Sequence, residues 1–396
     1  MTKQASSRLS TGFTIVELLV VIVVIGILAA ITIVSYTNLS KKATEAALVS
    51  DLDNAKKQLS IFQAENDKYP DTIRCDIPDS STNKCIKTGS GDSFNYSPNR
   101  LNDPSSYILA KTKSNTSYVI TNDSQPAAIA LAQPEACPSG FIPVPGSLTY
   151  GTSGFCVMKY EAKNAGGNVP VSAASGSPWV DITQNMAIIN SANVAGCTGC
   201  HLITEAEWLT IAQNVLGVAS NWSSGVVGTG YIYSGHNDGT PDNSLAASAD
   251  NDGYSGTWQG SPSNQKRTLT LSNGQVIWDM AGNVWEWTAG KSTNDKPGDI
   301  NNTYLSWIEW PTINVNGSLS PSPTPVMTGI DGAASWNSTK GIGQLVSDVK
   351  DITQKGFVRG GLWATGDAAG IMALYINFAP DFEGGAVGFR VAAPAP

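Results

Sequence analysis

The segment Cys197-Thr-Gly-Cys200-His201 has residue types and spacing that could do chemistry. Two cysteines separated by two residues and followed by histidine match the pattern that attaches c-type haem. The chain contains 2 histidines, so a haem iron would take His236 or a methionine as its second ligand. The same thiols could instead close a local disulfide. A zinc site would need a fourth ligand, which the sequence does not provide in this segment.

An apolar segment with one internal charge covers residues 12–34, GFTIVELLVVIVVIGILAAITIV. It follows a short polar leader with Lys3 and Arg8, and it is long enough to cross a bilayer. Its charged residue, Glu17, would be costly as a bare carboxylate in hydrocarbon, so it needs a partner or a purpose. An ordinary secretory signal has a shorter apolar core without an acid inside. The segment therefore predicts a membrane helix with a specific use for Glu17.

The basic leader, Gly12, the sequence Phe13-Thr-Ile-Val-Glu17 and the apolar run together resemble the N-terminus of type IV prepilins. The resemblance implies that prepilin peptidase removes residues 1–12 and that the new amino terminus, Phe13, is methylated. It also implies that Glu17 neutralises the terminal amine of Phe13 in a neighbouring copy, as other pilin subunits bundle into a filament. We therefore expect a membrane-anchored protein of the cell surface, in a type IV pilus.

Composition fits an exported protein. The net charge of -8 and the absence of Lys/Arg clusters argue against a nucleic-acid partner. Charged residues make up 14% of the chain, while glycine alone contributes 39 residues, which suits a loop-rich β protein. At 396 residues the chain can bury the cores of two domains.

The 6 cysteines all follow the predicted anchor, outside the membrane, where disulfides persist. Their spacing suggests three local pairs, although six cysteines allow many other connectivities. The suggested pairs are Cys75 with Cys85, Cys137 with Cys156, and Cys197 with Cys200.

The predicted helix continues beyond the apolar segment to about Asn66. An apolar stripe recurs at spacings of three and four residues, which marks one helical face. Pro70 ends the helix because proline disfavours helical backbone at the residue before it. We assign residues 13–70 to a pilin transmembrane and spine helix. The stripe consists of Leu48, Leu52, Ala55, Leu59 and Phe62.

A small head follows the spine. Residues 107–110 and 117–121 are strand-like, and residues 113–116 between them read as a hairpin turn. We expect one small antiparallel sheet within residues 71–125, packed on the helix. A Pro/Ala-rich linker is predicted for residues 126–136.

All 11 tryptophans lie beyond residue 136, which places a domain boundary there. One amphipathic segment, residues 204–213, reads as a helix with a capping box made by Thr204 and Glu207. The rest of residues 137–396 is short strands and Gly/Asn/Asp loops. We expect an α+β chain whose second domain has little regular structure.

Several segments of residues 137–396 resemble the formylglycine-generating-enzyme family, which implies a C-type-lectin-like fold. The enzyme needs a redox cysteine pair after its Arg-Gly-Gly segment, and Thr365 and Gly370 stand at those places. A threonine cannot replace a thiol, so we expect no enzyme activity. His201 begins one family segment, where a polar residue is expected for fold reasons. In chain order the segments are HLITEAEW (201–208), DGYSGT (252–257), WDMAGNVWEW (278–287), RGGLW (359–363) and VGFR (387–390).

The same resemblance implies calcium sites, since hard oxygens in a tight loop suit this ion. The alternative is a capped turn in which the carboxylates accept from backbone amides. The first set would use the carboxylates of Asp279 and Glu286 and the carbonyls of Gly282 and Val284. The second would use Asp252 and the Tyr254 carbonyl with Asn243 and the Ser244 carbonyl.

Residues 359–390 resemble the C-terminal variable region of receptors that are diversified by retroelements. The resemblance implies a ligand-binding surface of variable positions on a fixed framework; the alternative is an ordinary surface of a stable domain. The variable positions would be Leu362, Ala364, Thr365, Asp367, Tyr375, Asn377, Phe378, Asp381 and Phe382. The framework would be Arg359, Gly360, Gly361, Trp363, Gly388, Phe389 and Arg390.

Taken together, the sequence predicts a pilin-like adhesin or receptor on the cell surface, with an unknown protein or glycan ligand. Two alternatives stay open. One is an exported redox or haem protein that uses Cys197, Cys200 and His201. The other is a purely structural pilin subunit.

Overall fold

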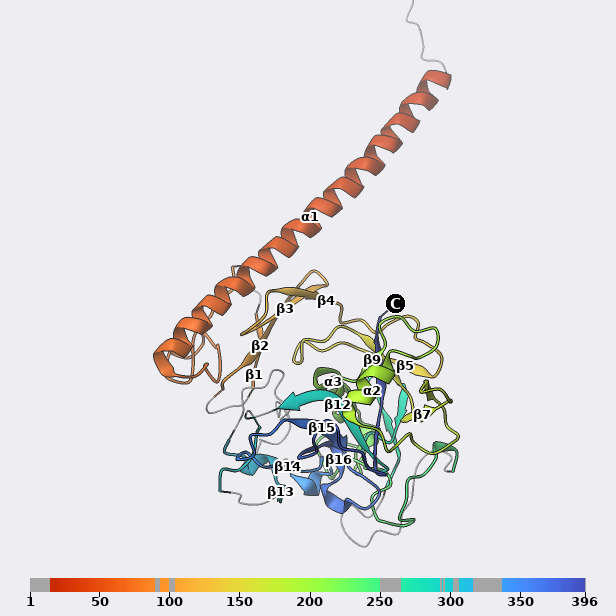
Figure 1. Cartoon of the computed structure of the whole chain (residues 1–396). Coiled ribbons are helices and arrows are strands. Elements are labelled where there is room, and N and C mark those ends of the chain that lie inside the picture. The colour runs from red at the N-terminus through yellow and green to blue at the C-terminus, as the bar shows by residue number, and fades with distance from the viewer. Residues whose placement is uncertain are drawn as a thin grey trace, which may run out of the picture.

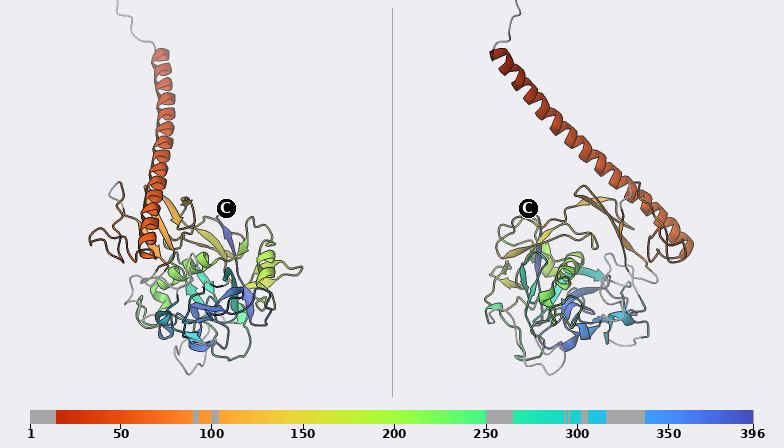
Figure 2. Two further views of the ribbon diagram at one scale, coloured as in Figure 1. Left: turned by 60° about the vertical axis from the view of Figure 1, so that its left-hand side comes forward. Right: turned by 180° about the vertical axis from the view of Figure 1, so that it is seen from behind.

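The computed structural model describes residues 15–89, 93–99, 104–249, 265–292, 294, 296–301, 306–315 and 337–395, without the side chains of residues 33–35, 37 and 38. A long helix carries a small sheet, and a larger globular part lies beyond that sheet (Figure 1). Two further views show that the N-terminal half of the helix stands away from everything else (Figure 2).

Helix α1 runs from Ile15 to Asn66 and ends where the sequence predicts. Its segment Ile15–Thr32 is long and apolar enough to cross a membrane, and none of that segment is buried against the rest of the chain. The second half of α1 buries the predicted apolar stripe against Tyr107, Leu109 and Ile120 of the small sheet. The periodicity of the sequence thus placed the packed face of the helix correctly.

Four antiparallel strands in the order β1-β2-β3-β4 form the small sheet. The turn between β2 and β3 has positive φ at Ser114 (49°) and Asn115 (63°), the backbone that matches the twist of a two-residue hairpin. β4 lies inside the predicted linker, so the sheet extends beyond residue 125. The strands are β1 (Asn95–Pro98), β2 (Tyr107–Lys113), β3 (Thr116–Thr121) and β4 (Ala127–Ile129).

The larger part contains a six-stranded mixed sheet in the order β13-β14-β16-β15-β12-β17. A second sheet has the order β5-β6-β18-β9, and β7-β8 and β10-β11 form two hairpins. The six-stranded sheet consists of β12 (Trp285–Ser292), β13 (Trp307–Ile308), β14 (Leu345–Ser347), β15 (Lys355–Gly360), β16 (Gly370–Ile376) and β17 (Val387–Phe389). The other strands are β5 (Phe141–Val144), β6 (Phe155–Met158), β7 (Ala162–Asn164), β8 (Pro170–Ser172), β9 (His201–Leu202), β10 (Thr268–Thr270), β11 (Val276–Trp278) and β18 (Val391–Pro394).

The six-stranded sheet separates two hydrophobic cores. Along β16, Leu374 and Ile376 belong to one core, while Ala373 and Tyr375 contact the other, as the alternation of a strand requires. Helix α3 (Glu205–Leu216) contributes to the first core and α2 (Gln184–Ser191) to the second. The predicted capping box of α3 is present, because Thr204 accepts from the backbone of Glu207 and Glu207 accepts in return. Short 3-10 turns are η1 (Ala219–Asn221), η2 (Ala247–Ala249), η3 (Trp310–Thr312), η5 (Ser338–Lys340) and η6 (Gly366–Ala368).

The segment predicted as a linker is tied to the larger part. Gly154 N donates to the carbonyl of Ala130 at 2.6 Å, and Gly146 N donates to the carbonyl of Leu131 at 2.9 Å. The side chain of Asn273 donates to Gln133 Oε1 at 2.6 Å. These bonds hold the larger part against the small sheet.

Candidate functional site

The turn predicted to bind calcium follows β11, and it is built around a buried ion pair. Asp279 has a φ of 57° and Gly282 a φ of 85°. The Asp279 carboxylate accepts from Arg267 Nε and Nη2, each at 2.7 Å, and both side chains are buried. A Cβ at residue 282 would lie 2.4 Å from the carbonyl oxygen of His236, so this turn requires glycine.

Glu286 on β12 is paired in the same way. Its Oε1 accepts from Arg390 Nη2 at 2.7 Å and its Oε2 from Arg390 Nε at 3.1 Å, with both side chains fully buried. A further buried pair joins Arg359 Nη2 to Glu205 Oε2 at 2.5 Å. In each of these contacts the planar guanidinium donates two hydrogen bonds to the carboxylate. The arginine therefore occupies the carboxylate oxygens that a metal ion would otherwise bind.

A third carboxylate lies in the same buried region. Glu161 Oε2 accepts from the Asn283 side chain at 2.6 Å and lies 3.9 Å from Lys163 Nζ. Burial, followed by the nearby charge of Asp279, raises the pKa of Glu161 well above its ordinary value. A carboxyl that favours its neutral form adds little negative charge to this region.

These contacts do not fit calcium at the first predicted set. Calcium takes six to eight oxygen ligands and prefers unpaired carboxylates, whereas Asp279 and Glu286 are each held by an arginine. The charges of this region are paired: Asp279 faces Arg267 and Glu286 faces Arg390, while Glu161 favours its neutral form beside Lys163. Within the described ranges, no group of three or more His, Cys, Asp or Glu side chains could hold a metal.

The second calcium set stays a prediction. Asn243 is exposed and Ser244 is half-buried. The carbonyl oxygen of Asn243 lies 3.0 Å from His236 Nε2, which already engages this oxygen. Asp252 and Tyr254 lie outside the described residues, as do Gly12 and Phe13 of the N-terminal motif.

The structure joins all six cysteines of the chain in the three suggested pairs. Because Cys197 is bonded to Cys200, neither thiol can form a thioether to haem. His201 is engaged as well: its Nε2 lies 3.0 and 3.1 Å from the Glu207 oxygens, and its Nδ1 lies 2.9 Å from the carbonyl of Gly199. The haem interpretation of this segment is therefore wrong.

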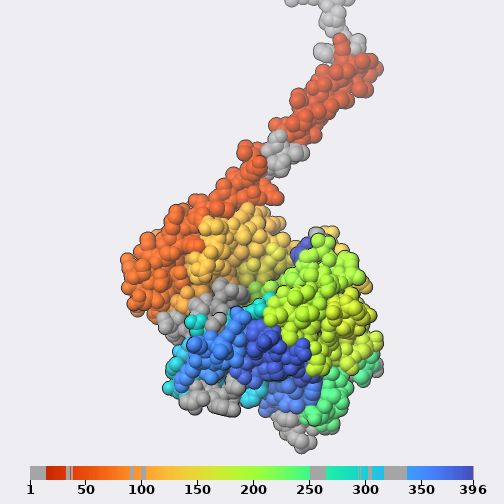
Figure 3. Space-filling view, viewed as in Figure 1, coloured from red at the N-terminus to blue at the C-terminus, as the bar shows by residue number. Residues whose placement is uncertain are grey.

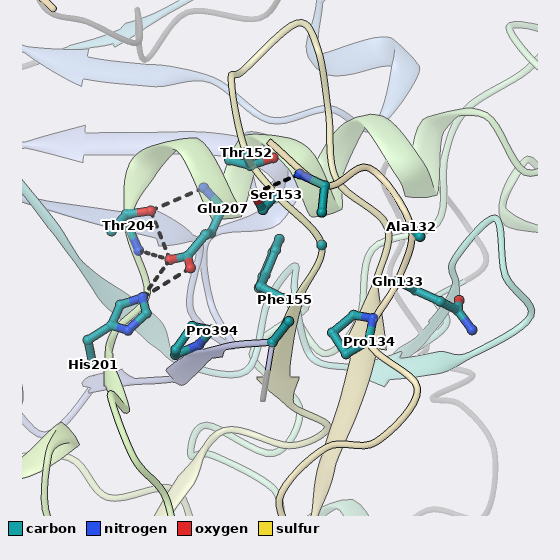
Figure 4. Close-up of a pocket in the computed structure, with 13 residues that line it drawn as sticks. Ala132, Gln133, Pro134, Thr152, Ser153, Phe155, His201, Thr204, Glu207 and Pro394 are labelled. Atoms are coloured by element: carbon teal, nitrogen blue, oxygen red, sulfur yellow. Dashed lines mark hydrogen bonds and ion pairs between the residues drawn. The ribbon is translucent and has the colours of Figure 1, made fainter. Parts of the chain in front are cut away.

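His201 and Glu207 form the polar wall of a cavity of about 620 Å³ beside the predicted linker. Figure 4 shows Glu207 pointing from the first turn of α3 toward both His201 and Thr204. Glu207 raises the pKa of His201 through their hydrogen bond. Glu207 Oε2 also accepts from the backbone N and the hydroxyl of Thr204, so the carboxylate is part of the helix cap. The His201–Glu207 pair therefore does not offer a free general base to the cavity. The other lining residues include Ala132, Pro134, Phe155 and Pro394.

The positions of the enzyme's redox pair cannot carry thiol chemistry. The Thr365 hydroxyl accepts from Leu362 N at 2.8 Å within a tight turn. Gly370 is paired with Gly360 in the β15-β16 hairpin. A Cβ at residue 370 would lie 2.2 Å from the carbonyl carbon of Ile342, so even a cysteine side chain would collide there.

The nine predicted variable positions are all at least partly exposed, while Trp363 alone among the seven predicted framework residues is not buried. The nine do not form one patch along the hairpin. Residues 362–367 lie in the connection from β15 to β16, and residues 377–382 follow the other end of β16. The hairpin therefore separates Leu362, Ala364, Thr365 and Asp367 from an aromatic group.

The aromatic group is continuous. The ring of Phe378 stacks on Phe382 with centroids 4.1 Å apart, and it lies 4.7 Å from Tyr375. Tyr375 in turn lies 5.7 Å from Trp285 and 6.5 Å from Trp307. We call these five side chains the aromatic surface; Trp285, which is 4% exposed, lies buried beneath the others. Trp307 is 43% exposed and Phe382 is 37% exposed, so the two ends of the run reach solvent.

Sequence reasoning missed Trp285 and Trp307. Trp307 lies opposite Val346, and Val346 lies opposite Tyr375, so one rung of the sheet carries both rings. Cross-strand partners point to the same face, which explains why the rings meet. No local motif marks Trp307, because its place depends on pairing with strands far along the chain.

Comparison with known families gives two matches. Residues 116–395 match the sulfatase-modifying factor enzyme 1-like domain. Residues 7–33 match the prokaryotic N-terminal methylation motif. The second match includes Gly12, Phe13 and Glu17, and it confirms the resemblance to pilin-type N-termini.

Curated relatives match the N-terminal region. The type II secretion system core protein G of Dickeya chrysanthemi is 35% identical over 65 residues, which are 16% of this chain and 42% of that protein. The type IV wide pilus major component PilA4 of Thermus thermophilus is 28% identical over 135 residues, 33% of this chain and 99% of that protein. The chain thus spans less than half the length of the first of these relatives.

Among solved structures, Treponema denticola variable protein 1 is similar at a TM-score of 0.30 and 18% identity, covering 73% of this chain and 99% of that one. A similarity of this size supports no transfer of function. The α+β fold of the larger part rests on the family match and on the strand order described above.

Proposed function

Because this chain belongs to the sulfatase-modifying factor enzyme 1-like family over residues 116–395 and carries the N-terminal methylation motif over residues 7–33, we propose that it is a pilin-type protein of the cell surface that recognises other molecules through its C-terminal domain. Three parts of the chain support this function: the anchor, the aromatic surface and the saturated cysteines.

The anchor supports membrane insertion and assembly with other pilin subunits. The Ile15–Thr32 segment of α1 exposes its apolar side chains, and Glu17 lies in the first turn. In this proposal prepilin peptidase cuts after Gly12, and Glu17 pairs with the amine of Phe13 in a neighbouring copy. An apolar span with a single acid suits a helix that leaves the bilayer to pack among identical helices.

The observation that carries the recognition role is the aromatic surface. Clustered, partly exposed rings are more often interaction sites than ordinary surface, since they give a large contact area at small entropic cost. Trp285, Trp307 and Tyr375 come from β12, β13 and β16 of the six-stranded sheet, and Phe378 and Phe382 lie in the turn after β16. The sheet therefore holds three of the rings in place before any ligand arrives, and the other two pack against them.

The cysteines support recognition in preference to catalysis. Every cysteine of the chain is in a disulfide, and residue 370 has no room for a side chain. The thiol chemistry of the related enzymes thus has no counterpart here. The saturated thiols likewise disfavour the exported redox alternative.

Diversification of residues 359–390 by a retroelement is part of the proposal. Exposure of all nine predicted positions on a largely buried framework suits a surface that varies without unfolding the domain. Sequencing the locus tests it: a neighbouring reverse transcriptase and a near-copy of these codons are expected. If the locus contains neither, the segment is not diversified by a retroelement and its surface is fixed.

The recognition role is tested with labelled full-length protein in detergent micelles against a panel of intact bacterial and eukaryotic cells. Trp307→Ala with Phe382→Ala should weaken binding to a recognised cell at least about tenfold, because hot spots concentrate in aromatic side chains. The melting curve should barely change, since both rings are at the exposed ends of the run.

Val226→Ala is the matched control, because Val226 is 57% exposed elsewhere in the same domain. If no cell on the panel is bound, or if binding survives the double substitution, the recognition role is wrong and a purely structural pilin subunit becomes the better interpretation.

A further inference from the structure

The chemistry around the aromatic surface narrows the class of ligand. This inference rests on the recognition role proposed above and adds the nature of the partner. Figure 3 shows the C-terminal residues in blue next to the yellow-green region that contains α2. The contact is direct, since Asn185 N donates to the carbonyl of Pro380 at 3.3 Å.

Three exposed carboxylates border the aromatic surface at this contact. Asp381 and Glu383 flank Phe382 in sequence. Asp181 is held nearby, because its backbone N donates to the carbonyl of Gly384 at 3.2 Å. Its carboxylate oxygens lie 3.7 and 3.9 Å from where a Cβ of residue 385 would be. Asp381 and Glu383 thus lie in the same turn as Phe382, and Asp181 lies against that turn.

None of these three carboxylates has a cation or hydrogen-bond partner among the side chains that the structure describes. Two lysines of the six-stranded sheet have other partners: Lys355 Nζ lies 2.9 Å from Asp351 Oδ2, and Lys291 Nζ donates to the Asn185 side chain at 2.8 Å. The arginines of the larger part are buried in the ion pairs given above. The border of the aromatic surface therefore carries three carboxylates without an ion pair among the described side chains.

We infer that the aromatic surface binds a basic segment of a protein partner, with Lys or Arg side chains laid over the exposed rings and their charges beside Asp381 and Glu383. Aromatic faces attract cations that come within about 6 Å of the ring centroid, and carboxylates at the rim strengthen that attraction. A neutral glycan could stack on the rings but would gain nothing from the acids. An acidic glycan would be repelled.

The probes are an amidated peptide alternating arginine and leucine, its counterpart with glutamate in place of arginine, and the neutral glycan maltohexaose. Each is titrated by calorimetry against the full chain in detergent micelles. The arginine peptide should bind, the other two should not, and added salt should weaken the binding.

Two variants locate the effect. Asp381→Asn with Glu383→Gln should weaken binding of the arginine peptide about fivefold, as expected for two exposed charge pairs. Phe382→Ala should weaken it about tenfold through loss of its ring. Glu65→Gln with Glu135→Gln is the matched control, because it removes two exposed carboxylates far from the aromatic surface and should leave binding unchanged.

The outcomes separate this inference from the recognition role. If maltohexaose binds and the arginine peptide does not, the basic partner is excluded. It is also excluded if the Glu65/Glu135 control weakens binding of the arginine peptide as much as the Asp381/Glu383 variant does. Binding to recognised cells that depends on Phe382 but not on Asp381 and Glu383 would likewise overturn it, while the recognition role stands. Loss of the Phe382 dependence itself would remove the recognition role.

Discussion

Three arginines form ion pairs in the interior of the C-terminal domain. Arg267, Arg359 and Arg390 are fully buried, and each is paired with a carboxylate that comes from a different part of the chain. A buried charge without its partner is strongly destabilising, so each pair specifies which segments meet. Asp279 and Glu286 thus hold Arg267 and Arg390 in the interior, and these ion pairs do not suit their predicted role as calcium ligands.

Asp279→Asn distinguishes a role in the ion pair from a role in calcium binding. Asparagine tolerates the φ of 57° at this position, so the substitution removes the charge without adding backbone strain. It should lower the free energy of unfolding by about 3 kcal/mol, because Arg267 would stay buried beside a neutral amide. Urea denaturation of the full chain measures the free energy of unfolding, once in excess calcium and once with a chelator. The decrease caused by the substitution should be the same in both conditions.

Asp181→Asn is the matched control, since Asp181 also has a positive φ, 54°, but is exposed. It should change the free energy of unfolding by less than about 0.5 kcal/mol. A loss at Asp279 that appears only in calcium would restore this carboxylate to a metal site.

At the scale of elements, the β15-β16 hairpin decides what the family's catalytic position can do here. The hairpin brings Gly370 against the backbone at Ile342 and Gly343, where a Cβ would lie 2.2 and 2.3 Å from the nearest atoms. Packing this close joins β16 to the segment before β14 and leaves no volume for chemistry. The element connects two parts of the fold, and the predicted variable positions lie at both of its ends.

Gly370→Ala should therefore destabilise the domain by about 3 kcal/mol or more, because the contact is with backbone that cannot move aside easily. Gly217→Ala is the matched control: Gly217 ends α3 with a φ of -78°, and its Cβ would lie 3.7 Å from the nearest atoms. That control should stay within about 1 kcal/mol of the parent chain. Equal melting temperatures for the two variants would mean that the hairpin does not pack as described.

Local patterns predicted local elements well. The stripe from Leu48 to Phe62, the hairpin turn at residues 113–116 and the cap of α3 each depend on neighbours within a few residues. β4 was missed because Ala-Ala-Ile has little strand preference of its own and forms by pairing with β3.

Contacts between distant residues account for what the sequence could not show at the candidate site. Arg390 and Glu286 are separated by 104 positions, and Arg267 and Asp279 by 12. The sequence placed Tyr375, Phe378 and Phe382 among the candidate positions through a resemblance, but Trp307 joins them only through β14. Contacts between side chains on strands that are far apart in the sequence leave no regular spacing, so the sequence alone does not predict them.

At the scale of the whole molecule, the helix and the small sheet hold the C-terminal domain in a fixed orientation. Helix α1 has 52 residues, which makes it about 78 Å long at 1.5 Å per residue. Its second half is fixed to the small sheet by the apolar stripe and by the ion pair of Lys111 with Asp51, 2.5 Å apart. The hydrogen bonds at Ala130 and Leu131 continue that connection to the larger part, so the orientation of the anchor sets the orientation of the aromatic surface.

The anchor itself gives the last prediction. In a cell that has prepilin peptidase, intact-mass measurement of the mature protein should show the loss of residues 1–12. Glu17→Ala should still insert in the membrane, because the variant helix is more apolar than the parent. It should assemble poorly, since the carboxylate that pairs with the terminal amine is gone. Immunoblots of sheared filaments measure the assembled protein, and immunoblots of membranes measure the inserted protein.

Val20→Ala is the control for assembly, because Val20 lies on the same exposed segment of α1 and carries no charge. It should reach the filament fraction as the parent chain does. Cleavage beyond the apolar run would indicate an ordinary secretory signal, and a Glu17→Ala chain that assembles like Val20→Ala would show that the acid has no part in packing. Cleavage beyond the apolar run would detach the C-terminal domain from a filament. The aromatic surface would then have to act on a soluble or singly anchored protein, where neighbouring copies cannot add to its avidity.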